Sequence, residues 1–380
     1  MRKRRSRRKS LSGKRRKIFL CCTIAAALLI GIVCRQSDLS AQQEAGKTQP
    51  LLSADILTSG NVHNEAYVDL QKDAWNPLED DSLEVNAQDP TESASEADYE
   101  TDGGDKPYPT EWNVSDQTEI IRTTFGQYSG TKFISLPTAG QVGNYTELEN
   151  SVLLEECTMS PAFKISVNNE PQVLIMHTHT TESYEPYVRE HFDPTFNYRT
   201  TDNEKNVVAV GEVIAEKLRE AGIGVIHSDA VHDYPSYNGA YERSAETVTA
   251  ILEQYPSIRV VLDIHRDAIG TDTAITQPVV EINGKEAAQI MIISGCDDGT
   301  MDMPNYMFNF RFACRLQEQM ENMYPGLTRP ILFDYRRYNQ NLTTGSLLIE
   351  VGSHGSTLDQ ALYAGALFGD ALVQVLLDLH

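Results

Sequence analysis

The chain has 380 residues, of which 41% are hydrophobic, so it is long enough for one large folded domain and additional segments. Its 54 acidic residues outnumber its 32 basic ones and give a formal net charge of −22. The first 17 residues hold 11 Lys or Arg and no acidic residue, so the rest of the chain is more acidic still. Because such a body repels nucleic acid backbones, we expect no nucleic-acid partner.

The basic leader, residues 1–17, runs directly into an uncharged and mostly apolar stretch at residues 18–34. As a helix this stretch spans roughly 25 Å, enough for a thin bilayer or a tilted helix. Since Lys and Arg stay on the cytoplasmic side, we expect a transmembrane anchor with a cytoplasmic N-terminus and an exported acidic body. A cleaved signal peptide is the alternative, with a small-residue site at 39–41.

Residues 35–105 are rich in Ser, Gln, Asn and acidic side chains and contain few aliphatic runs. Such a composition cannot bury enough apolar surface to offset the entropy of an ordered chain. We therefore predict a disordered, acidic, flexible tether. Residues 106–165 form the N-terminal part of the exported domain, with short possible strands such as 132–136.

From residue 166 to 380, short apolar runs alternate with amphipathic segments. The pattern predicts strands at 173–176, 224–227, 258–265, 288–294 and 346–351, and helices at 206–221, 240–254, 305–324 and 358–377. Alternation of this kind is typical of an α/β fold whose sheet is mostly parallel and has helices on both faces.

Only three of the six cysteines, Cys157, Cys296 and Cys314, lie outside the predicted anchor and its border. An odd number at such wide spacing is not a disulfide framework, although one pair could form. The chain has no Cys-x-x-Cys motif, so any metal must be held by His and carboxylate side chains.

Such side chains occur where three predicted strands end. His177 and His179 follow the first strand, on one face of an extended segment, with Glu182 close behind; His265 ends the central strand, and Glu350 interrupts the last one. Functional groups collect at the carboxyl ends of parallel strands. Three protein ligands, an open position for water and a further carboxylate are the parts of a catalytic zinc site. A lone histidine can also be a hydrogen-bonded core residue, whereas a buried glutamate must be paired, protonated or functional.

Five segments carry a resemblance to a known family. They are VLIMHTHTTESY at 173–184, YRTTDNEKNVVAVG at 198–211, HDYPSYNGAYE at 232–242, VVLDIHRDAI at 260–269 and YRRYNQNLTTGSLLIEVGSHGST at 335–357. In this order the chain resembles stage II sporulation protein P, a family of membrane-anchored peptidoglycan hydrolases of endospore-forming bacteria. The resemblance implies the fold of zinc-dependent N-acetylmuramoyl-L-alanine amidases, which is shared with zinc carboxypeptidases. It also implies that residues 166–380 are a zinc-dependent hydrolase domain.

The resemblance also suggests roles for individual residues. His265 fits the histidine that follows the central strand in these amidases, and Glu350 fits their catalytic glutamate. His179 and Glu182 have the His-x-x-Glu spacing with which zinc carboxypeptidases hold their metal. His177 is an additional or alternative first ligand.

The carboxylate ligand has its own alternative, because the amidases usually place a ligand glutamate just before the first helix. This chain has Asp202 there, so the resemblance leaves Glu182 or Asp202 as the third zinc ligand. Arg266, Arg336 and Arg337 are candidates for contacting the carboxylates of the stem peptide.

The family resemblance implies cleavage of the amide between N-acetylmuramic acid and L-alanine, and a second activity on peptide cross-links. It implies sporulation proteins D and M as partners, and a cell membrane location at the sporulation septum. A peptidoglycan-binding scaffold with a structural metal site is one alternative, with His177 as a fourth ligand. A zinc carboxypeptidase or endopeptidase that acts only on peptides is the other.

Overall fold

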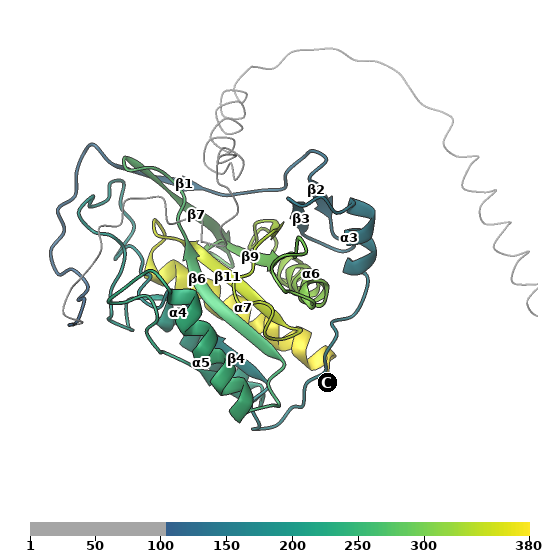
Figure 1. Ribbon diagram of the computed structural model, residues 1–380. Coiled ribbons are helices and arrows are strands. Elements are labelled where there is room, and N and C mark those ends of the chain that lie inside the picture. The colour runs from purple at the N-terminus through teal and green to yellow at the C-terminus, as the bar shows by residue number, and fades with distance from the viewer. Residues whose placement is uncertain (1–103) are drawn as a thin grey trace, which may run out of the picture. The chain divides into compact units, whose positions relative to one another are not determined.

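The computed structural model describes residues 104–380 (Figure 1). The basic leader, the predicted anchor and nearly all of the predicted tether lie outside the described residues. Within this range the chain forms a mixed α/β fold with one larger and one smaller sheet.

The larger sheet has eight strands in the order β2-β3-β10-β9-β11-β6-β4-β5. Their bounds are β2 Phe133–Ser135, β3 Gln141–Asn144, β4 Val173–Met176, β5 Val225–His227, β6 Val260–Asp267, β9 Ile290–Gly295, β10 Ile331–Asp334 and β11 Ser346–Ser353. The β2–β3 and β9–β11 pairs are antiparallel, and the other five neighbouring pairs are parallel. Three parallel neighbours, β11, β6 and β4, therefore end at the same edge.

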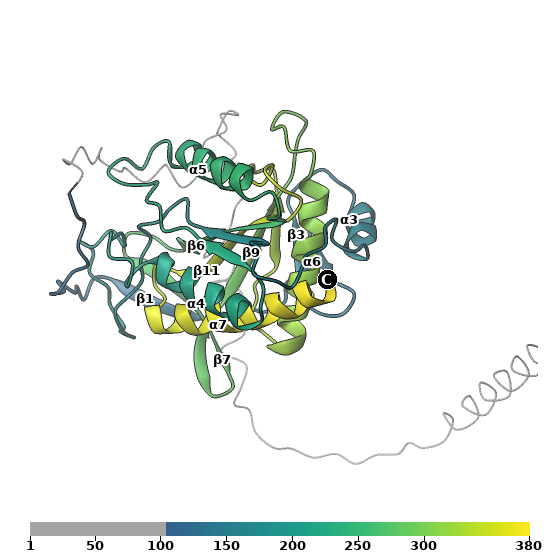
Figure 2. The ribbon, with the colours of Figure 1, turned by 90° about the horizontal axis from the view of Figure 1, so that it is seen from below.

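Helices cover both faces of this sheet. They are α3 Asn150–Cys157, α4 Val207–Glu220, α5 Ala240–Gln254, α6 Tyr306–Met323 and α7 Leu358–Asp378. Figure 2 shows α5 on one side of the strands and α4 and α7 on the other. Along β4, Ile175 belongs to the main core with α4, α6 and α7, while Leu174 and Met176 pack with Val248 of α5. Burial on both faces explains why β4 is apolar throughout.

Among the described residues, one helix, α7, has the length and composition to cross a membrane, but 67% of its most apolar window is buried in this fold. Its N-terminus is fixed by a capping box between Thr357 and Gln360. A Cβ atom at Gly369 would lie 2.8 Å from Cγ of Lys217, so the glycine permits α4 to approach closely. The apolar sequence of α7 therefore follows from its central place in the core.

A second sheet, in the order β1-β7-β8, was not anticipated from the sequence. Its strands are β1 Glu119–Thr123, β7 Ala274–Ile282 and β8 Lys285–Ala288. The β7–β8 hairpin turns at Asn283 and Gly284, whose φ angles are 53° and 76°. An Asn-Gly pair is a signal of a tight hairpin turn, and it could have revealed the connection between these strands.

Residues 106–165 share both sheets and the main core with residues 166–380. Strands β2 and β3 extend the larger sheet beside β10, and β1 pairs with β7 in the smaller one. Helix α3 places Leu153 and Cys157 in the same core as α6 and α7.

Candidate metal centre

The register of the sheet brings the predicted site residues together. Met176, the last residue of β4, lies opposite Asp263 of β6, and His265 lies opposite Glu350 of β11. The segment that follows β4 therefore reaches the same place as His265 and Glu350. This is the carboxyl edge where the sequence predicted a site.

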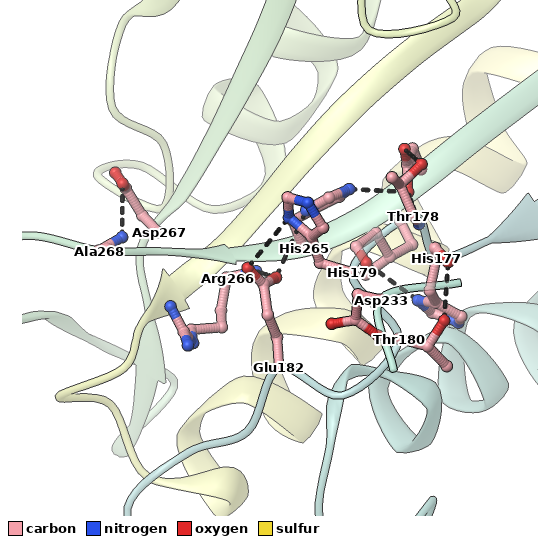
Figure 3. A network of polar contacts seen from close by, with 12 residues as sticks. His177, Thr178, His179, Thr180, Glu182, Asp233, His265, Arg266, Asp267 and Ala268 are labelled. Atoms are coloured by element: carbon pink, nitrogen blue, oxygen red, sulfur yellow. Dashed lines mark hydrogen bonds and ion pairs between the residues drawn. The ribbon is translucent and has the colours of Figure 1, made fainter. Parts of the chain in front are cut away.

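His179, Glu182 and His265 form a buried group whose potential ligand atoms all lie within 4.8 Å of one another. His179 Nδ1 is 3.5 Å from Glu182 Oε1, and His265 Nδ1 is 3.4 Å from Glu182 Oε2. Zinc bonds of about 2.0–2.2 Å place tetrahedral ligands roughly 3.4 Å apart. The donor set and its spacing therefore fit a zinc ion. Figure 3 shows the carboxylate of Glu182 directed at the ring of His265.

Glu182 is positioned by its main chain as well as its side chain. Its carbonyl accepts a hydrogen bond of 2.8 Å from the amide of Val207 in the first turn of α4, and its Oε2 accepts one of 3.1 Å from the amide of Arg266. Burial opposes ionisation of the carboxyl group. The Arg266 charge and the contacts with His179 and His265 outweigh it and hold the pKa of Glu182 well below its ordinary value. The side chain is thus an anion, as a metal ligand requires.

Asp263 supports His265 from the opposite side of the imidazole. Its Oδ1 lies 2.8 Å from His265 Nε2, so the two side chains form an ion pair when the ring is protonated. Asp263 is itself fixed by Thr178, whose amide and hydroxyl donate to it at 2.8 and 2.6 Å. A carboxylate behind a ligand histidine orients the ring and increases its basicity.

The protonation of His265 follows from these contacts. Burial lowers its pKa, but the charges of Asp263 and Glu182 outweigh burial and raise the pKa well above the ordinary value. In the metal-free protein the ring is therefore protonated, and a metal must displace a proton to bind it.

Within residues 104–380, Glu350 combines a carboxyl oxygen without a hydrogen-bond partner with a raised pKa, the properties of a general acid or base. Among the described residues its Oε2 atom has no hydrogen-bond partner, although it is shielded from solvent. Burial, together with the nearby charge of Asp267, raises the pKa of Glu350 well above the ordinary value. A buried polar atom without a partner is costly, so its presence beside His265 favours a functional role.

His177 lies outside the ligand group, and the expectation that it shares a face with His179 was wrong. Strand β4 ends at Met176 and residues 178–181 form a turn, so the two histidines do not lie on one extended strand. His177 Nδ1 contacts the carbonyl of Ile264 at 2.9 Å, and its Nε2 lies 2.9 Å from Nε2 of His227. In Figure 3 it lies away from the carboxylate of Glu182.

Asp202 also lies outside the group. It is exposed, and its side chain accepts a hydrogen bond of 3.0 Å from the amide of Glu204 in the turn before α4. Among the described residues, Glu182 is the carboxylate that faces both histidines.

The three candidate arginines have different surroundings. Arg266 is buried, and its guanidinium donates to the carbonyls of Ser183 and Tyr198, both at 3.2 Å. It therefore secures the segment that carries Glu182. Arg336 pairs with Asp334 at 3.0 Å and donates to the hydroxyl of Tyr338, and Arg337 is exposed beside Asn341. A role of these arginines in substrate binding stays a prediction.

Sequence reasoning assigned no role to several residues that border the group. The ring of Tyr237 stacks on His179 with centroids 4.7 Å apart, and Tyr241 meets the same ring edge-on at 5.4 Å. The guanidinium of Arg199 lies 4.6 Å from the centre of the Tyr237 ring and pairs with Asp233 at 2.7 Å. Both tyrosines lie in the segment 232–242, and the resemblance of this segment to the family is the signal that could have pointed to them.

Fold and site together describe a mixed α/β protein with a buried His-Glu-His group that could bind a metal. The pattern of the family Stage II sporulation protein P matches residues 48–373, and the chain belongs to this family. It is 28% identical over 247 residues to Stage II sporulation protein P of Bacillus subtilis (strain 168). That match covers 62% of this chain and 58% of the relative.

Two solved structures are similar to part of the chain. N-acetylmuramoyl-L-alanine amidase AmiC2 of Nostoc punctiforme is 12% identical with a TM-score of 0.33, and the match covers 56% of this chain and 97% of that one. The N-acetylmuramoyl-L-alanine amidase from Clostridium difficile 630 is 17% identical with a TM-score of 0.32, with the same coverage of 56% and 97%.

Proposed function

We propose that the protein is a zinc-dependent peptidoglycan hydrolase of the sporulation engulfment machinery, which cleaves the amide between N-acetylmuramic acid and L-alanine. The observation that carries this proposal is the buried group of His179, Glu182 and His265 beside Glu350, whose shielded Oε2 atom has no hydrogen-bond partner among the described residues. Membership of the stage II sporulation protein P family supports the substrate class.

Each side chain has a part in this mechanism. His179, Glu182 and His265 would hold the metal, and Asp263 would keep the ring of His265 in position. Bound zinc supplies a Lewis acid for the scissile carbonyl and lowers the pKa of water to about 7. Glu350 takes a proton from the attacking water and returns it to the leaving nitrogen. Its raised pKa suits a group that must hold that proton between the two steps.

The proposed location follows from the sequence pattern of residues 1–35. Residues 18–34 anchor the protein in the cell membrane, and the acidic body faces the wall at the sporulation septum. Sporulation proteins D and M are the proposed partners, on the basis of the family.

The described geometry favours an enzyme over a scaffold with a structural metal. Structural zinc sites normally have four protein ligands, whereas catalytic ones keep a position for water. The group has three members, and the ring nitrogens of His177, the proposed fourth, contact Ile264 and His227. A hydrolase that acts only on peptides is distinguished by its products.

The test uses the full-length protein, purified in detergent. We expect about one zinc per chain, and mass spectrometry of digested peptidoglycan should find stem peptides that begin with a free L-alanine amine. An active wild-type protein without metal would contradict the zinc mechanism. Products cut only within peptides would establish the peptide-only alternative.

Three variants separate the proposed roles. His265→Ala should lose both metal and hydrolysis, whereas Glu350→Gln should keep zinc and lose at least about 100-fold in turnover. The control variant Asp202→Asn removes a carboxylate that lies outside the group, and it should retain both zinc and hydrolysis. Loss of zinc from Glu350→Gln, or from Asp202→Asn, would be inconsistent with the assignment.

A further inference from the structure

Two cysteines far apart in the sequence meet in the core. Cys157 ends α3 and Cys314 lies in the middle of α6, 157 positions further along the chain. Their Sγ atoms are 2.9 Å apart and both side chains are buried. A disulfide bond measures about 2.05 Å, so the sulfur atoms need to approach by only roughly 0.9 Å to form one.

The surrounding contacts hold the two helices in this arrangement. On α6, Phe312 meets Phe163 edge-on with ring centroids 5.2 Å apart, and Arg311 pairs with Glu156 of α3 at 2.5 Å. The residues that flank both cysteines are thus packed together, so the pairing of the sulfur atoms is a consequence of the fold.

Cys296, the third cysteine among the described residues, has different surroundings. Its thiol contacts the main-chain oxygen of Asp297 at 3.7 Å, and it is buried like the other two. It therefore offers a matched internal control.

We propose that Cys157 and Cys314 form a disulfide bond once the domain has left the cytoplasm. The inference rests on the exported location proposed above, because disulfides persist in oxidising compartments. It is independent of the metal and of the bond that the enzyme cleaves.

The oxidant is the disulfide of a thiol–disulfide oxidoreductase. The thiolate of one cysteine attacks that disulfide and forms a mixed disulfide; the second thiolate then attacks the mixed disulfide and releases the oxidoreductase with two thiols. Each cysteine gives up one proton and one electron, and the chain loses two hydrogen atoms. Burial raises the pKa of Cys314 well above its ordinary value, so its thiol is unreactive in the finished fold. The exchange therefore takes place before α3 packs on α6.

The bond would tie α3 to α6 and close a loop that contains His179, Glu182 and His265. It would thus fasten residues 106–165 to the part of the chain that carries most of the site. A bond across so long a loop restricts the unfolded chain strongly.

The first experiment maps thiols in full-length protein. Cells that express it are treated with N-ethylmaleimide under denaturing conditions, and the protein is digested without reductant. We expect a linked peptide pair that contains Cys157 and Cys314 and separates on reduction, while Cys296 carries the label. Labelling of Cys157 and Cys314 in most exported molecules would overturn the inference. Digestion of the same cells with protease, after the wall is removed, shows whether the domain is exported.

The second experiment measures thermal unfolding of the purified protein. Reductant should lower the Tm of the wild type and of Cys296→Ser by about 5 °C or more. It should not change the Tm of the double variant Cys157→Ser/Cys314→Ser. An equal effect of reductant on all three proteins would contradict the proposed bond.

Discussion

At the scale of single residues, the site depends on which charges and hydrogen bonds stabilise each ionisable group that is shielded from solvent. Glu182 lies against Arg266 and two histidines, and His265 lies between two carboxylates. The Oε2 atom of Glu350 is shielded from solvent and has no hydrogen-bond partner among the described residues. Uncompensated burial of this kind costs free energy, and function is the usual reason that it persists.

His177 allows a test of the same principle outside the candidate metal site. Burial, reinforced by the neighbouring His227, lowers the pKa of His177 to about 3, compared with about 6.5 for a free histidine. Between these values the unfolded chain binds a proton that the folded protein does not. The free energy of unfolding should therefore fall as the pH drops below about 6.5, by up to about 1.4 kcal/mol per pH unit from this one group.

The variant His177→Gln should remove this contribution, because the amide can donate to Ile264 and accept from His227 but does not titrate. We expect a flatter loss of stability in urea denaturation at pH 7, 6 and 5, with zinc content unchanged. His354, whose pKa is also lowered to about 3 by desolvation, remains in the variant and accounts for part of the remaining slope. Parallel curves for the two proteins, or loss of zinc, would disprove this account of His177.

At the scale of elements, a short N-terminal segment supports the candidate metal site. Residues 104–113, which we call the N-terminal strap, lie along the segment that follows Glu182. The Tyr108 hydroxyl donates to the Tyr184 carbonyl at 2.6 Å, and the Lys106 carbonyl accepts from the Thr201 amide at 2.8 Å. The strap thus fixes the backbone on both sides of the bridge between Glu182 and Arg199.

The variant Tyr108→Phe removes one of these contacts and leaves a partly buried carbonyl with one donor fewer. A lost hydrogen bond of this kind costs about 1 kcal/mol, so we expect zinc affinity to fall roughly fivefold in competition with a chelator. Tyr187→Phe is the control, because Tyr187 is 55% exposed. If Tyr108→Phe binds zinc as tightly as the control, the strap does not position Glu182.

At the scale of the whole molecule, the proposed anchor and tether would determine how far the folded domain reaches from the membrane. A flexible chain of the length predicted for residues 35–105 has a root-mean-square span of roughly 45 Å, and like charges extend it further. Such a reach would carry a membrane-bound domain into the inner layers of the wall.

Shortening the predicted tether to about ten residues, with the N-terminal strap retained, should leave hydrolysis of soluble muropeptides unchanged. Wall degradation in cells should decrease, because the domain can no longer reach its substrate. Comparison of the two assays at equal protein amounts checks this prediction. Failure on soluble muropeptides as well would mean that the removed residues belong to the folded domain.

Much of the local structure could be predicted from periodicity. The helix predicted at 240–254 is present as α5 with the same bounds, and the one predicted at 206–221 is α4, which begins after the capping residue Asn206. These predictions succeed because apolar spacing and caps act over a few residues. The hairpin of β7 and β8 was missed, because its strands carry polar residues such as Gln277 and Glu281 among the apolar ones.

The sequence by itself determined the residue types at the ends of β4, β6 and β11, and hence a site that histidines and carboxylates could form. The tertiary structure decided which of them meet. A turn after β4 directs His179 toward Glu182 and His265 while His177 lies against Ile264, and Asp202 is left in solvent. The local sequence pattern is the same for residues that are neighbours in the chain. The direction in which each histidine ring points, however, depends on contacts with distant strands. Only the packed sheet supplies those contacts.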